Sequence, residues 1–222
     1  MFMGHYGASF AVKSADKGIP LWLLFLAVQF LDVLWGLFVL AGIEKLRIVP
    51  GITSSLPLDL YYMPYTHSLI AAIAWSGVAA VAFRLMTRRA LTKSLAPAIW
   101  VGVAVFSHWI LDLIVHRPDL PLYDDAYKVG FGLWNYPLPA LLLETAFLFA
   151  GLWLYLRSTQ GTTFGARYGM ILFCVVILGT HVVAFFGPPP AGPRAAAVAF
   201  LSIYLIFAAM AFWLERKRHL RA

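Results

Sequence analysis

The chain has 222 residues, of which 62% are hydrophobic and 12% are charged, and its mean hydropathy is +0.80. A soluble domain carries about 25% charged residues, and a soluble fold of this size lacks a core large enough to bury so much apolar surface. This composition excludes a soluble globular enzyme, a disordered tail and a disulfide scaffold. We expect an all-α, polytopic integral membrane bundle that forms a single membrane domain over residues 1–222.

Six apolar segments approach the length of about 20 residues that a helix needs to cross a bilayer. Their apolar runs are continuous rather than alternating, which disfavours a β-barrel. Two long proline-containing loops, 44–64 and 117–136, follow the first and the third segment. The predicted helices span residues 19–43, 65–86, 95–116, 137–156, 168–186 and 196–214.

The basic residues predict the orientation of the chain. The net charge is +7, but the basic residues lie in short loops and at the chain ends, which indicates membrane topology and not a nucleic-acid partner. One side of the predicted topology carries 12 of the 17 Lys and Arg residues: Lys13, Lys17, Arg84, Arg88, Arg89, Lys93, Arg157, Arg167, Arg216, Lys217, Arg218 and Arg221. The richer side is expected in the cytoplasm. We therefore expect a bacterial-type inner (plasma) membrane, contact with membrane lipid, and both termini cytoplasmic.

Ionisable side chains inside the predicted helices are the candidate functional residues, because each costs about 2.5–3.5 kcal/mol at the centre of a bilayer. Asp32 lies in the first helix and His67 opens the second. In the third helix, His108 and Asp112 are four residues apart and therefore share one face. Imidazole suits zinc, while carboxylate extends the choice to manganese, iron or magnesium. These four residues predict a divalent-metal site, with zinc as the first choice and a structural hydrogen bond or a proton relay as alternatives.

Three further ionisable residues have simpler interpretations. His116 precedes Arg117-Pro118-Asp119, and we expect it to cap the end of the third helix. Glu144 is expected to pair with a polar neighbour inside the bundle, with a role as catalytic base as the alternative. His181 has no polar companion nearby in the sequence, so we expect a core histidine with satisfied hydrogen bonds.

The same residues carry a family resemblance. Gly4-His5, the acid at Asp32, Tyr65-Thr66-His67-Ser68, and Ser107-His108 followed by Asp112 resemble the motifs of the membrane-bound metal-dependent hydrolases, also described as LexA-binding inner-membrane hydrolases. The resemblance covers residues 1 to about 118. It implies a helical bundle with a metal site formed by His5, Asp32, His67, His108 and Asp112.

Two motifs depart from the family pattern, and one residue poses a problem of position. Tyr62-Met63 stands where the family has His-Arg, and Asp32 is a single acid where the family has Pro-Asp-x-Asp. The charge count places the N-terminus in the cytoplasm, whereas His67 is predicted near the outer face. His5 therefore reaches the site only if residues 3–16 form a re-entrant helix, and otherwise it lies outside the site.

The leading functional hypothesis is a metal-dependent hydrolase that acts on an ester or phosphoester. A lipid-like substrate is favoured because a membrane-embedded site meets lipids first. Asp112 or Asp32 is the expected proton acceptor, whichever is not committed to the metal. The alternatives are a proton or cation transporter, a non-catalytic subunit of a larger complex, and a haem-binding protein with His108 and His181 as axial ligands.

Overall fold

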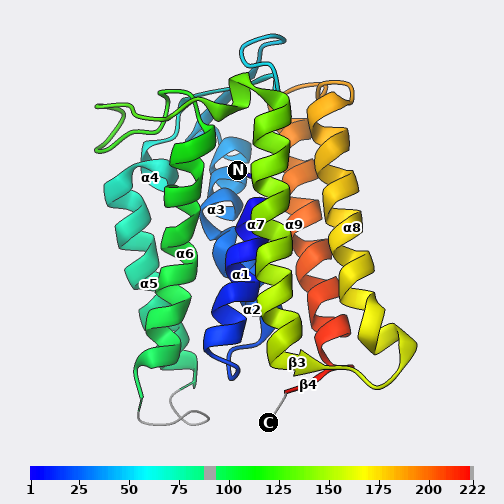
Figure 1. Ribbon diagram of the computed structural model, residues 1–222. Coiled ribbons are helices and arrows are strands. Elements are labelled where there is room, and N and C mark those ends of the chain that lie inside the picture. Colours follow the sequence, from blue (N-terminus) through cyan, green and yellow to red (C-terminus); the bar gives the residue numbers. More distant parts are fainter. Residues whose placement is uncertain (88–93, 221–222) are drawn as a thin grey trace.

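The computed structural model describes residues 1–87 and 94–220 as an all-α bundle (Figure 1). In the described part, five helices are long and apolar enough to cross a membrane, or six if one bent pair counts as a single span. The bent pair consists of α2 (Leu21–Val28) and α3 (Phe30–Leu40). The five long helices are α5 (Leu69–Thr87), α6 (Ala96–Val115), α7 (Pro137–Ser158), α8 (Phe164–Phe186) and α9 (Pro193–Glu215).

Short elements close the two ends of the bundle (Figure 1). At the end that we call the loop end, β1 (Lys45–Ile48) pairs antiparallel with β2 (Leu58–Tyr62), with Arg47 opposite Asp59. The short helices α4 (Pro64–His67) and η1 (Leu133–Asn135) also belong to this region. At the opposite end, the basic end, β3 (Thr159–Gln160) pairs with β4 (His219–Leu220). Four basic residues that contributed to the predicted orientation lie outside the described residues: Arg88, Arg89, Lys93 and Arg221.

The N-terminal segment forms a half-length helix, α1 (Gly4–Ala15), in the interior of the bundle. Figure 1 shows α1 in blue among the longer helices, and it contacts α2, α6 and α7. Its first turn carries the buried His5. Near its other end, the buried Lys13 lies 2.7 Å from a carboxylate oxygen of Glu215, close to the basic end. α1 thus spans only the part of the bundle between His5 and the basic end.

The structure differs from the prediction of continuous helices at 19–43 and 65–86. The first is broken at Gln29, and the axes of α2 and α3 differ by 56°. There the Gln29 side chain donates a hydrogen bond to the carbonyl of Phe2. The second is broken at Ser68, whose extended backbone separates α4 from α5. Neither break lies at a glycine or proline. Tertiary contacts with the N-terminal segment and the neighbouring helices therefore determine where the two helices are interrupted.

Aromatic rings fill the interior on the basic-end side of His5. Tyr6 and Phe10 of α1 pack against Phe25 of α2, with ring centroids 4.7 Å and 5.4 Å apart. Tyr155 of α7 lies 5.3 Å from the Phe10 ring, and Phe173 of α8 lies 5.8 Å from the Phe25 ring. All five side chains are buried. This aromatic layer separates the region around His5 from the basic end.

Two glycines allow α1 to approach α7 closely. A methyl group at Gly7 would overlap the backbone carbonyl of Phe147, and one at Gly151 would overlap the backbone of Gly7. Helices in membranes associate through such small residues because their backbones can then come close. Gly7 and Gly151 therefore set the position of α1, and with it the position of His5.

We predict that Gly7→Ala destabilises the bundle by about 1–3 kcal/mol, the usual cost of overpacking. The measurement is the midpoint of thermal unfolding in detergent. Gly179→Ala in α8 is the matched control, because no atom lies within 4 Å of the added methyl group. The control should match or exceed the wild-type midpoint, since alanine favours a helix over glycine by about 1 kcal/mol. Equal midpoints for Gly7→Ala and the wild type would contradict this role of Gly7.

Candidate metal centre

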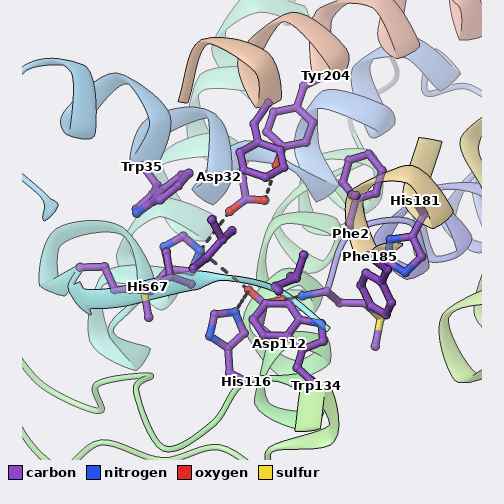
Figure 2. Close-up of a pocket in the computed structure, with 17 residues that line it drawn as sticks. Phe2, Asp32, Trp35, His67, Asp112, His116, Trp134, His181, Phe185 and Tyr204 are labelled. Atoms are coloured by element: carbon purple, nitrogen blue, oxygen red, sulfur yellow. Dashed lines mark hydrogen bonds and ion pairs between the residues drawn. The ribbon is translucent and has the colours of Figure 1, made fainter. Parts of the chain in front are cut away.

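The five residues of the predicted site lie together in the structure. His5 Nε2 is 3.1 Å from Asp112 Oδ1, and His108 Nε2 is 3.1 Å from Asp112 Oδ2. His67 Nε2 is 3.3 Å from Asp32 Oδ1. Their ligand atoms form two groups, each within 4.8 Å, and His108 belongs to both. Figure 2 shows Asp32, His67 and Asp112 facing one another across a short gap.

A sixth residue, His116, joins this cluster from the end of α6. It follows the last residue of the helix, and its backbone N–H donates to the carbonyl of Asp112 as the expected cap does. Its ring also turns toward the cluster, with Nε2 3.6 Å from Asp112 Oδ2. The four-residue spacing of His108, Asp112 and His116 is the signal in the sequence for this position, whereas we had expected His116 only to cap the helix.

The Nδ1 atoms of two of these histidines are held by hydrogen bonds to oxygen acceptors. His108 Nδ1 donates to the carbonyl of Val28 over 2.7 Å. This carbonyl belongs to the last residue of α2, so the break at Gln29 lies directly beside the acceptor. His116 Nδ1 donates to Asp119 Oδ1 over 2.8 Å. Both rings therefore carry their proton on Nδ1 when neutral, which leaves a lone pair on Nε2.

His67 is held in the same way through a relay of two side chains. The Thr66 hydroxyl donates to Glu44 Oε2 over 2.6 Å, so it accepts from His67 Nδ1 over 2.7 Å. Glu44 Oε1 also accepts the backbone N–H groups of Tyr65 and Thr66. Burial raises the pKa of the Glu44 carboxyl, and His67 together with these hydrogen bonds opposes that rise. Glu44 and Thr66 were not identified from the sequence.

The three Nε2 lone pairs point at carboxylate oxygens, which are also acceptors. Such contacts are favourable only if the ring is protonated or a cation lies between the atoms. Buried His108 Nε2 has no hydrogen-bond partner despite its closeness to Asp112. The amino group of Met1 contacts Asp112 Oδ1, so a positive group already fits beside this carboxylate. Histidines that bind metals typically donate Nδ1–H to a carbonyl or carboxylate and present Nε2 to the ion. The residues present therefore fit a divalent cation.

Asp32 is oriented by a residue that lies 172 positions away in the chain. The hydroxyl of Tyr204 in α9 donates to Asp32 Oδ2 over 2.6 Å. The other oxygen, Oδ1, is left to face His67 and His108, at 3.3 Å and 3.6 Å. Tyr204 was missed by the sequence analysis because a tyrosine in an apolar helix resembles an ordinary core residue.

An ion-pair network at the loop end supports His116. Asp59 of β2 pairs with Arg47 over 2.8 Å and also contacts Arg117. Arg117 Nε in turn donates to Asp119 Oδ2 over 3.2 Å. Since the other oxygen of Asp119 holds His116, the network connects the surface strand pair to the cluster.

Glu144 and His181 form a second polar group near the first. Glu144 Oε2 accepts the backbone N–H groups of Phe2 and Gly4, so it caps the N-terminal end of α1. Its other oxygen lies 3.6 Å from His181 Nε2. Glu144 thus has the polar neighbour that we expected. His181 differs from the prediction, because it is buried and neither ring nitrogen has a hydrogen-bond partner.

Both polar groups border one cavity, which contains about 600 Å³ of space when its open mouth is included. Figure 2 shows His67 on one side of this cavity and His181 with Phe185 on the other. Apart from these polar residues, the wall is mostly apolar and comes from the N-terminal segment, α3, β2 with its flanking residues, η1, α8 and α9. The apolar lining residues are Met1, Phe2, Trp35, Leu56, Leu58, Leu60, Met63, Trp134, Ala184, Phe185 and Phe200.

Comparison of the chain with protein-family models, with curated proteins and with solved structures finds no match.

Proposed function

We propose that the protein is a membrane-embedded, metal-dependent hydrolase of an ester or phosphoester, with a lipid-like substrate. The observation that carries this proposal is the convergence of three Nε2 lone pairs on two carboxylates. These lone pairs belong to His67, His108 and His116, and each ring is fixed through Nδ1. The resemblance of residues 1–118 to the membrane-bound metal-dependent hydrolases, which rests on these same residues, points to the same chemistry.

In this proposal the ligands are His67, His108 and Asp112, with Asp32 beside the ion, and His5 and His116 lie close enough to add to them. Zinc suits this mixture of imidazole and carboxylate best, while manganese, iron and magnesium are the alternatives for a carboxylate-rich subset. A divalent ion held there would supply a Lewis acid and lower the pKa of a bound water toward about 7.

The two carboxylates have different surroundings, which suggests different roles. The Asp112 side chain is 2% exposed and lies near four histidines, as expected of a ligand. The Asp32 side chain is 19% exposed and lines the cavity, and Tyr204 fixes one of its oxygens. We therefore assign Asp112 to holding the ion and Asp32 to accepting the proton of the attacking water.

The apolar wall of the cavity supports an amphiphilic substrate. An acyl or alkyl chain would lie against residues such as Phe185 and Phe200 while its ester group reaches Asp32. The aromatic layer on the basic-end side of His5 favours such a blind site over a transport pathway through the bundle. His108 Nε2 faces two carboxylates, which favours a bare cation over haem.

The orientation of the protein in the membrane is also part of this proposal. We place the basic end in the cytoplasm of a bacterial-type inner membrane, because this end carries most of the Lys and Arg residues that the structure describes. Met1 lies inside the bundle beside Asp112 and not at the basic end, so the expectation that both termini are cytoplasmic is kept in this proposal for the C-terminus alone. Lys13 of α1 lies close to the basic end. The metal centre and its cavity would then lie in the outer half of the membrane.

We predict that purified protein contains stoichiometric zinc or another divalent metal, and that Asp112→Ala and His108→Ala lose it, because each removes a central ligand. Inductively coupled plasma mass spectrometry measures the content. Asp125→Ala is the control, since this acid pairs with Lys128 in a loop. Wild-type protein without metal, or an equal metal content in all variants, would contradict the proposal. A Soret band would favour the haem alternative.

The hydrogen bonds that connect Glu44, Thr66 and His67 predict how a single hydroxyl affects zinc affinity. Thr66→Val keeps the shape of the side chain but removes the hydroxyl between Glu44 and His67, so Zn²⁺ affinity should fall about 10–100-fold. Competition with a fluorescent chelator measures it. Ser76→Ala is the control, because that hydroxyl bonds only the Ala72 carbonyl in α5. An unchanged affinity in Thr66→Val would show that the relay does not support a ligand.

The reaction itself is tested with micellar p-nitrophenyl decanoate and a p-nitrophenyl decyl phosphodiester. We expect hydrolysis of one of them, loss of activity with a chelator, and recovery with Zn²⁺. Asp32→Asn should lower kcat about 10²–10⁴-fold, the usual contribution of a general base. Metal-loaded protein that hydrolyses neither compound would contradict the proposed function.

A further inference from the structure

We propose that His181, with Glu144 behind it, donates the proton to the leaving group of the substrate. This inference rests on the proposed hydrolase function and adds a catalytic residue on the side of the cavity opposite His67. It replaces the expectation of a satisfied core histidine.

The position of His181 in α8 favours this role. His181, Ala184 and Phe185 lie on one face of the helix and line the cavity. The ring of His181 stacks on Phe2 with centroids 5.8 Å apart and lies 4.1 Å from the Phe185 ring. Its side chain is 1% exposed, and both nitrogens lack hydrogen-bond partners. An imidazole left unpaired in this way is costly, and a polar atom of a bound substrate would satisfy it.

Glu144 supplies the second half of the arrangement. It is fully buried, and its Oε2 is occupied by the N–H groups of Phe2 and Gly4. Its Oε1 has no hydrogen-bond partner and lies 3.6 Å from His181 Nε2. A buried carboxylate beside an imidazole orients the ring and stabilises its positive form, as in other hydrolytic sites. The pair can therefore hold one proton next to the cavity.

The other ionisable side chains around the cavity are already engaged. Asp32, His67, Asp112 and His116 belong to the metal centre, and Tyr204 is bonded to Asp32. Among the lining side chains that the structure describes, His181 is thus the ionisable one outside that network. An alkoxide that leaves into an apolar cavity has little access to bulk water, so a nearby acid is needed.

In the proposed hydrolysis, Asp32 accepts one proton and His181 donates another. The water oxygen forms a bond to the carbonyl carbon or phosphorus, and Asp32 takes one proton of that water. The bond from this centre to the alcohol oxygen breaks, and its electron pair stays on that oxygen. His181 donates a proton to it, so the products are an acid and an alcohol. The proton on Asp32 passes to solvent, and His181 is protonated again from solvent.

The test compares leaving groups in zinc-loaded, full-length protein. Decanoyl esters and decyl phosphodiesters are used in pairs that release either p-nitrophenolate, which leaves without a proton, or ethanol, which needs one. His181→Gln should lower kcat about 10²–10⁴-fold for the ethyl compounds and leave the p-nitrophenyl compounds close to wild type. Glu144→Gln should show the same pattern with a smaller loss, because Glu144 acts through His181.

Zinc content and the midpoint of thermal unfolding are measured in parallel and should not change in His181→Gln. Cys174→Ala, a buried change elsewhere in α8, is the control for effects of packing. Equal losses for both leaving groups, or loss of zinc in His181→Gln, would overturn the role as proton donor and leave the hydrolase proposal standing. Zinc-loaded wild-type protein that hydrolyses none of the compounds would overturn both.

Discussion

The buried carboxylate of Asp112 is the constraint to which the surrounding structure responds. A charge taken out of water costs several kcal/mol unless it is paired and hydrogen-bonded. In this bundle the carboxylate faces His5, His67, His108 and His116, and the amino group of Met1 contacts it as well. These partners come from segments as distant as α1, α4 and α6. Their meeting at one carboxylate ties together the half of the bundle formed by residues 1–118.

Two helical segments of the bundle are interrupted next to this cluster. In a bilayer, non-helical backbone is tolerated only where it is buried in protein or lines a water-filled cavity. The break at Gln29 lies beside the carbonyl that holds His108, and the break at Ser68 follows His67. The carbonyl of His67 is satisfied in turn by the indole N–H of Trp109. Both irregular points thus exchange hydrogen bonds within a helix for hydrogen bonds made beside a candidate metal ligand.

The sequence predicted the helical bundle because hydrophobic length is a local property, and it predicted His108 and Asp112 together because a four-residue spacing is local too. It also nominated Asp32 and His67 as ionisable residues inside predicted helices, and His5 through a motif. It did not predict Glu44, Thr66 or Tyr204 as supports, since their partners are 21 to 172 positions away or depend on which ring nitrogen is bonded. The helix breaks were missed for the same reason: neither Gln29 nor Ser68 is a strong helix breaker, and long-range contacts decide there.

The half-length helix α1 links the two polar sides of the cavity. Its first turn places His5 beside Asp112, while the N–H groups of Phe2 and Gly4 at its start bind Glu144. Its backbone is set against α7 through Gly7 and Gly151, and α7 is the helix that carries Glu144. A shift of α1 would therefore move a candidate metal ligand and loosen the carboxylate behind His181 at the same time. Close glycine packing, the candidate metal centre and the proposed proton donor are thus coupled through α1, and the precision of the site depends on this helix of 12 residues.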